Sequence, residues 1–182
     1  MKWSWRVSVF LALILLALVV LGGCRLIPPA SGTGNDQADP APVEEPITLI
    51  LFFGGPNAEG LAREERTVLR TNERTEELVI QELIKGPESE QFYATIPEGT
   101  RLLDIQVSEG TAVVDFSGEI QTQHPGGTTG ETLTVYSIVN SLTELPGIVF
   151  VQILIEGETA DSLAGHIEIR EPLARNPFVI LP

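Results

Sequence analysis

The stretch TTGETLTVYSIVNSLTELPGIVFVQILIEG, residues 128–157, contains two apolar patterns of different period. Its first half predicts an amphipathic helix, which Pro146-Gly147 ends. The apolar residues at helical spacing are Val135, Ile138, Val139, Leu142 and Leu145. Its second half, IVFVQILIEG, is a long apolar run, which is typical of a strand in the middle of a sheet. A helix leading into a central strand therefore forms the centre of the expected fold.

The start of this helix has a recognisable chemistry. Thr128 and Glu131 stand at the spacing of a capping box, and Gly126 and Gly127 permit positive φ ahead of them. An alternative is a phosphate site, because helix N-termini attract anions. The loop has no nearby Lys or Arg and the helix opens with Glu131, so the sequence favours a plain capped helix.

Upstream, two further elements are predicted. Arg101–Ser117, RLLDIQVSEGTAVVDFS, has two apolar-rich runs around Ser108-Glu109-Gly110, which predicts a β-hairpin. Residues 73–85, ERTEELVIQELIK, predict a helix capped by Asn72 or Thr75. Lys85-Gly86-Pro87 supplies a strong stop for it.

The ends of the folded part carry weaker strand signals. ITLILFF, residues 47–53, predicts a buried strand, and residues 64–70 predict a second one. HIEIR, residues 166–170, predicts a last short strand, and the tail 176–182 either adds an edge strand or folds over the core. The expectation is one α+β domain at 47–175, a two-layer arrangement of a mixed β-sheet and two amphipathic helices.

Four stretches in this order resemble the GerMN domain of sporulation and spore-germination lipoproteins. They are LVIQELIKGP (78–87), TIPEGTRLLDIQVSEGTAVVDFS (95–117), residues 126–157 and GHIEIREPLAR (165–175). The resemblance implies a fold similar to the ring-building motif and a scaffold role at a membrane or cell wall. The family's domain has no known catalytic residues, so none is carried over. The founding germination proteins carry two such domains in tandem, whereas this chain has one.

The N-terminal segment is typical of a lipoprotein signal peptide at residues 1–23. Lys2 and Arg6 precede a charge-free run, and Leu21-Gly22-Gly23-Cys24 resembles a bacterial lipobox. We expect Cys24 to be lipidated and to anchor the protein at the extracytoplasmic face of the cell membrane. An uncleaved transmembrane anchor is the alternative. Residues 24–46, with five prolines after Cys24, are expected to form a disordered tether.

Charge and composition exclude several classes of function. The chain has 182 residues and a net charge of −14, and loss of Lys2 and Arg6 with the signal peptide makes it −16. Such an acidic chain is repelled by nucleic-acid phosphates, so no nucleic-acid partner is expected. Cys24 is the single cysteine, and His124 and His166 are the two histidines, so neither a zinc site nor a nucleophile–base pair is recognisable.

Two carboxylate pairs are candidates for acid–base or calcium chemistry. Asp115 and Glu119 lie four apart, and Glu156 and Glu158 flank Gly157. In so acidic a chain such pairs arise by chance, and no EF-hand spacing is present, so no catalytic residue, metal or cofactor is expected. The histidines, without a partner in the sequence, are expected to be solvated.

The sequence thus predicts a non-catalytic scaffold or protein-interaction lipoprotein with a protein partner or self-association, in sporulation or spore germination. The alternative is an envelope module that binds a small ligand or a cell-wall polymer. A hydrolase is the third and least favoured class. An aromatic-rich groove would favour the polymer binder.

Overall fold

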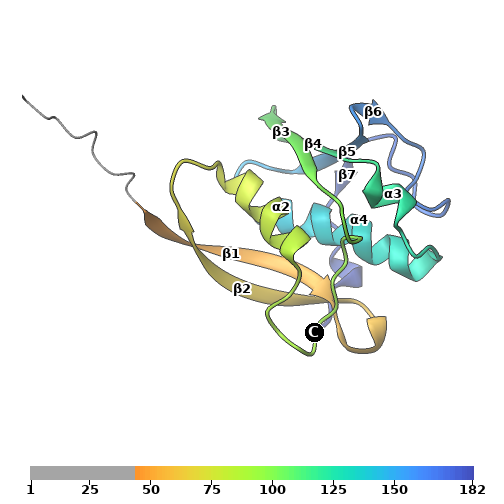
Figure 1. Cartoon of the computed structure of the whole chain (residues 1–182), viewed down its shortest axis with the longest axis horizontal. Coiled ribbons are helices and arrows are strands. Elements are labelled where there is room, and N and C mark those ends of the chain that lie inside the picture. The colour runs from red at the N-terminus through yellow and green to blue at the C-terminus, as the bar shows by residue number, and fades with distance from the viewer. Residues whose placement is uncertain (1–43) are drawn as a thin grey trace, which may run out of the picture. The chain divides into compact units, whose positions relative to one another are not determined.

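The computed structural model describes residues 44–182 (Figure 1). The predicted signal peptide, Cys24 and nearly all of the predicted tether lie outside these residues. The first described strand, β1 (Glu45–Gly54), pairs antiparallel with β2 (Leu61–Arg70), and the 3-10 turn η1 (Pro56–Ala58) lies between them. Alternation along β1 buries Leu49, Leu51 and Phe53 in the main core. These two strands form a sheet of their own.

The second sheet contains the predicted hairpin and the predicted central strand. Its order is β3 (Leu102–Ser108), β4 (Thr111–Phe116), β5 (Phe150–Ile155) and β6 (Glu158–Thr159), and β7 (Leu173–Ala174) pairs with the start of β5. β3 and β4 are antiparallel, whereas β4 and β5 are parallel. Because β5 has partners on both edges, its predicted central place is confirmed.

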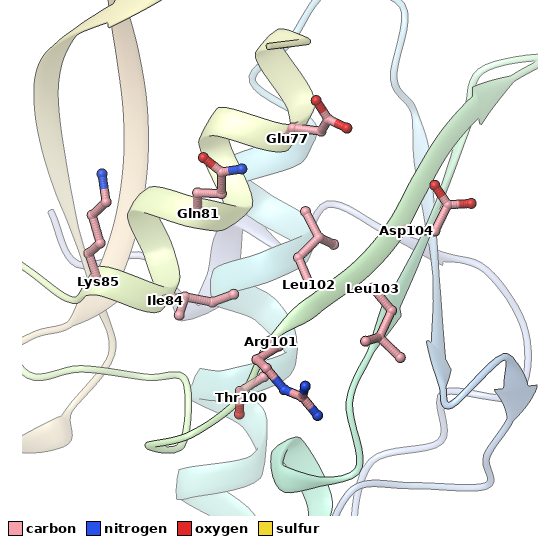
Figure 2. A pocket seen from close by; sticks show the side chains of 9 residues that line it. All are labelled: Glu77, Gln81, Ile84, Lys85, Thr100, Arg101, Leu102, Leu103 and Asp104. Atoms are coloured by element: carbon pink, nitrogen blue, oxygen red, sulfur yellow. The ribbon is translucent and has the colours of Figure 1, made fainter.

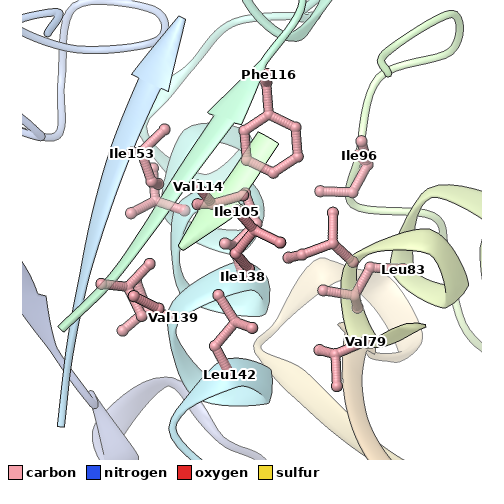
Figure 3. Packing of buried hydrophobic residues seen from close by; sticks show 14 of the residues in the cluster. Val79, Leu83, Ile96, Ile105, Val114, Phe116, Ile138, Val139, Leu142 and Ile153 are labelled. Carbon is pink, nitrogen blue, oxygen red and sulfur yellow. The ribbon is translucent and has the colours of Figure 1, made fainter. Parts of the chain in front are cut away.

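Three helices complete the described part of the chain: α2 (Thr75–Lys85), α3 (Glu119–Thr122) and α4 (Thr128–Leu142). Both α2 and α4 contact strands of both sheets. The main core gathers their apolar faces with those of the strands, as Figure 3 shows for Val79, Leu83, Ile105, Val114 and Ile138. The predicted α+β class, with a mixed sheet and two amphipathic helices, is confirmed, although the strands are divided between two sheets. The sequence predicts loop where the short α3 forms.

Two predicted helix caps are wrong, although the predicted stop is correct. The residue before α2 is Arg74, whose backbone N–H donates to the Glu77 carboxylate at 3.2 Å, so neither Asn72 nor Thr75 caps that helix. Gly127 precedes α4 with a φ of 80°, and the Glu131 carboxylate points elsewhere. α2 ends at Lys85, and Gly86 leaves the helix with a φ of 88°.

The strand predicted at 166–170 is wrong. The backbone N–H of His166 donates to the side chain of Glu131, and Gly165 turns the chain with a φ of 91°. Both features divert the segment from a strand ladder. Ile169 is nevertheless fully buried, and its carbonyl accepts a hydrogen bond from the Gln152 side chain at 2.9 Å.

The C-terminal tail is part of the domain. It forms the 3-10 turn η2 (Pro177–Val179), and Ile180 then makes a single parallel bridge with Leu61. Val179 and Ile180 pack on a small second core of Phe52, Leu61 and Leu133. Of the two predicted outcomes, the tail combines both: one bridge at the sheet edge and a cover over apolar side chains.

None of the helices formed by residues 44–182 has the length and apolar character needed to cross a bilayer.

Candidate interaction surface and buried polar clusters

Of the four acids that are candidates for chemistry, Asp115 lies on β4, Glu119 begins α3, Glu156 lies in the turn after β5 and Glu158 lies on β6. Asp115 accepts a hydrogen bond from the N–H of Gly157 at 2.9 Å, and Glu156 accepts from the N–H of Gly118 at 2.7 Å. A hydrogen bond from Ser117 holds the pKa of Glu119 below its ordinary value. Glu158 is exposed on β6. Asp115 and Glu156 thus hold backbone N–H groups where β4 and β5 end, and no hydrogen bond in the described structure joins the acids of either sequence pair.

His124 is half-buried and not solvated as expected. Its Nδ1 accepts from the N–H of Gly126 at 2.9 Å, so its Nε2 carries the proton and donates to Thr134 Oγ1 at 3.1 Å. Thr134 in turn donates to the carbonyl of Thr95 at 2.6 Å. Burial lowers the pKa of His124, which favours this neutral form. The ring therefore holds the glycine-rich loop against α4.

His166 belongs to a second cluster, built on the fully buried Glu131. The Glu131 carboxylate accepts from the backbone N–H groups of Leu163, Ala164 and His166 at 2.8–2.9 Å, and His166 Nδ1 lies 3.1 Å away. Burial opposes the charged form, but the hydrogen bonds from Ala164 and His166 prevail and lower the pKa of Glu131. This carboxylate fixes the loop after β6 to α4. Its partners are more than 30 residues away in the chain, so the sequence offers no signal for it.

Arg66 is the centre of a third buried cluster, which the sequence does not predict. Its guanidinium contacts Glu64 at 2.5 Å and Glu82 at 2.9 Å, and it donates to the carbonyl of Gly86 at 2.9 Å. It also lies 5.5 Å from the centre of the Phe53 ring. These contacts join β2 to the C-terminal end of α2. Arg66 is one of two arginines in EERTVLR, a strand that looks exposed in the sequence, and nothing there indicates that it is buried.

A groove between α2 and β3 is a large, open concave feature near the sheet (Figure 2). It has a volume of about 510 Å³ and is lined by Glu77, Gln81 and Ile84 from the helix, and by Arg101–Asp104 from the strand side. The side chains of Leu103 and Val107 on β3 are 45% and 41% exposed. β3 is the first strand of its sheet, so β4 is its only strand neighbour among the described residues.

No metal or cofactor site emerges in the described part of the chain. No group of three or more His, Cys, Asp or Glu residues within 44–182 is arranged to hold a metal ion. The first turn of α4 carries Glu131 and no basic residue, which does not suit a phosphate. A recess of about 330 Å³ beside Gly54 and Thr95 has Tyr93 as its one aromatic side chain, and the groove of Figure 2 has none.

Comparison with known proteins identifies the family. Residues 50–161 match the Germane family model, described as sporulation and spore germination. A comparison with curated proteins gave no match.

Similar folds occur among solved structures. The first GerMN domain of the sporulation protein GerM from Bacillus subtilis is 23% identical, with a TM-score of 0.58 over 71% of this chain and 98% of that one. The tandem GerMN domains of the same protein are 21% identical, with a TM-score of 0.56 over 76% of this chain. A Clostridium perfringens chain provisionally classed as a lipoprotein is 24% identical, with a TM-score of 0.49 over 72% of this chain and 87% of that one.

This chain spans 48% of the tandem pair, about half of its length. Its described residues therefore correspond to one GerMN unit. The fold agreement and the family match over more than half of the sequence lead to one conclusion: the chain belongs to the Germane family of sporulation and spore germination, and residues 44–182 have the fold of a GerMN domain.

Proposed function

We propose that this protein is a lipoprotein anchored at the extracytoplasmic face of the membrane through Cys24, and that its GerMN domain is a non-catalytic protein-interaction module in sporulation or germination. One observation carries the proposal. The imidazole of His124 and the carboxylates of Asp115 and Glu156 hold backbone N–H groups, and the His166 ring contacts the buried Glu131 carboxylate, whereas a strand edge and the groove beside it are left open.

The polar clusters support a structural role because their partners are backbone groups. His124 binds the N–H of Gly126, Glu131 binds the N–H groups of a loop, and Asp115 binds the N–H of Gly157. A catalytic acid or base needs a free lone pair or proton that faces a substrate. His124, Glu131 and Asp115 are already bonded to the backbone and lack that freedom.

The alternative of a wall-polymer binder receives little support. Sugar-binding grooves present aromatic faces, and the groove between α2 and β3 has no aromatic side chain. Its lining combines Leu, Ile and charged residues, a composition that suits a protein segment.

Photo-crosslinking in living cells tests the proposal. A photoreactive amino acid is placed in the full-length protein at Gln81, which lines the groove, or at Gln106 on β3. Thr67 on β2 is the matched exposed control. We expect discrete protein adducts from Gln81 and Gln106 and none from Thr67. An absence of protein adducts from both test sites, in protein that accumulates normally, would contradict an interaction role.

A further inference from the structure

The free edge of β3 has main-chain groups available for pairing. The turn Glu109-Gly110 has φ values of 51° and 80°, and Ser108 faces Thr111 across it. In a hairpin with a two-residue turn, the pair that closes the turn is hydrogen-bonded. Along the two strands, bonded pairs then alternate with non-bonded pairs, so Gln106 bonds to Val113. The N–H and C=O groups of Ile105 and Val107 therefore point away from β4. No other hydrogen bond within residues 44–182 reaches them.

The usual protection against pairing is confined to the first half of this edge strand. Natural edge strands are shielded by charged side chains, proline or bulges. β3 has a bulge between Leu102 and Asp104 and the charge of Asp104, but no charged residue or proline from Ile105 to Ser108. The groove of Figure 2 runs beside the first part of the strand and leaves room for an added segment.

We propose that β3 pairs antiparallel with β3 of a second copy of this chain, around a two-fold axis at Ile105. This inference rests on the proposed interaction function and names its partner. In this register Ile105 faces its counterpart, and Leu103 faces Val107 of the other copy. The main-chain groups of Ile105 point outward, so the two Ile105 residues exchange two hydrogen bonds at the axis, whereas the facing Asp104 and Gln106 form a pair without main-chain hydrogen bonds.

The side chains select this register. Asp104 faces Gln106 of the other copy, and the same amide–carboxylate bond already forms within one chain, at 2.8 Å. Arg101 is 68% exposed and lies 3.9 Å from the Glu119 carboxylate of its own chain, and in this register it also lies beside Glu109 of the other copy at the end of the groove. Opposite charges across strands stabilise pairing.

Neighbouring registers are less favourable. An axis at Asp104 sets the two Asp104 carboxylates against each other, and like charges directly opposite destabilise a pair of strands. An axis at Gln106 places the apolar Leu103 opposite the charged Glu109 of the other copy. Arg101 then no longer faces Glu109. A two-fold contact uses the same edge on both copies, so the assembly closes as a dimer.

Charge reversal tests the register. Arg101→Glu and Glu109→Arg are made separately in the full-length protein in detergent, and self-association is measured by sedimentation. Each variant alone has two repulsive pairs per dimer and should lose roughly tenfold in dimer affinity, since each exposed ion pair contributes only modestly and two are reversed. An equal mixture of the two variants should recover wild-type association, because each introduced carboxylate then meets an introduced guanidinium. Arg63→Glu on β2 is the matched control and should leave association unchanged.

A second measurement covers the case in which a reversal disturbs folding. In a Cys24→Ser background, copies with Asp104→Cys are mixed with copies carrying Gln106→Cys and oxidised. The mixed disulfide should exceed both self-disulfides, because facing Cβ atoms lie about 5 Å apart.

Three results would overturn the dimer. They are unchanged association of both reversal variants, failure of their mixture to recover, and wild-type protein that sediments as a monomer at the highest concentration reached. If the photo-crosslinks from Gln81 and Gln106 persist with a different protein, the interaction function stands while the dimer falls. If no protein adduct forms at all, both fall.

Discussion

Glu131 is a fully buried acid whose charge is matched by backbone donors. Its neutral replacement, Glu131→Gln, should lower the free energy of unfolding by about 2–4 kcal/mol. The reason is that the NH2 group of glutamine cannot accept from the backbone N–H groups that now donate to the carboxylate. Urea unfolding at pH 7 measures the loss. Glu158→Gln, at an exposed position on β6, is the control and should change stability by less than about 0.5 kcal/mol.

The same residue predicts a pH dependence. The pKa of Glu131 is lower in the folded protein than its ordinary value of 4.5. Its contribution is therefore complete above pH 4.5 and is lost as the pH falls through the folded pKa. The stability difference between wild type and Glu131→Gln should shrink on acidification below pH 4.5. A difference that stays constant down to the acid transition would show that the charge contributes nothing.

For single residues, sequence reasoning succeeds where the cause is local. Gly86 and Gly110 are expected at a helix stop and a hairpin turn, and both have positive φ. It fails for Glu131 and Arg66, because their partners come from distant parts of the chain. Thr128 and Glu131 have the spacing of a capping box, yet tertiary donors take the carboxylate.

Element boundaries give a second test. Gly86→Ala should lower the free energy of unfolding by about 1–2 kcal/mol, because a φ of 88° is strained for a residue with a Cβ. The added methyl group meets only Ala94, at 3.7 Å, so no clash adds to this cost. Gly118→Ala is the matched control, since its φ of −58° suits alanine. Equal losses from the two variants in thermal unfolding would contradict the conformational explanation.

The C-terminal turn offers a matched pair of apolar residues. Ile180 packs on the small core of Phe52, Leu61 and Leu133, whereas Phe178 is 96% exposed. Ile180→Ala should lower stability by about 1–2 kcal/mol, and Phe178→Ala should have almost no effect. A larger loss from Phe178→Ala in urea unfolding would mean that the tail packs differently.

For elements, the success of prediction depends on pattern length. The long run IVFVQILIEG is correctly placed as the central strand, because a strand that is apolar on both faces is stable only where both faces are covered. The five residues HIEIR alternate like a strand. They do not form one, because Gly165 turns the chain just before them and the backbone N–H of His166 donates to the Glu131 carboxylate. The four residues of α3 are too few for a periodic signal.

At the scale of the whole molecule, periodicity does not say which strands pair. The sequence predicts one sheet, yet β1 and β2 pair only with each other among the described strands and meet the second sheet through α2 and α4. The groove beside β3 could not be predicted from the sequence either, because it depends on how α2 is placed against that strand.

Membrane attachment is also a property of the whole molecule. Cys24→Ala should abolish acyl labelling and block processing of the precursor, because the thiol is the acceptor in the proposed lipobox. Metabolic labelling with a fatty acid and the electrophoretic mobility of the chain measure both. Continued labelling and cleavage after Gly23 in the variant would overturn the anchor.

The central claim, that the domain acts by contact and not by catalysis, is tested most directly by removing both histidines. A full-length protein with His124→Gln and His166→Gln replaces the wild type in cells that depend on it, and spore formation and germination are counted. Glutamine retains hydrogen-bonding groups at both sites, so the protein should accumulate and melt nearly normally, and we predict close to wild-type counts. A collapse of function in protein that accumulates and melts like the wild type would point to an active site and contradict the account.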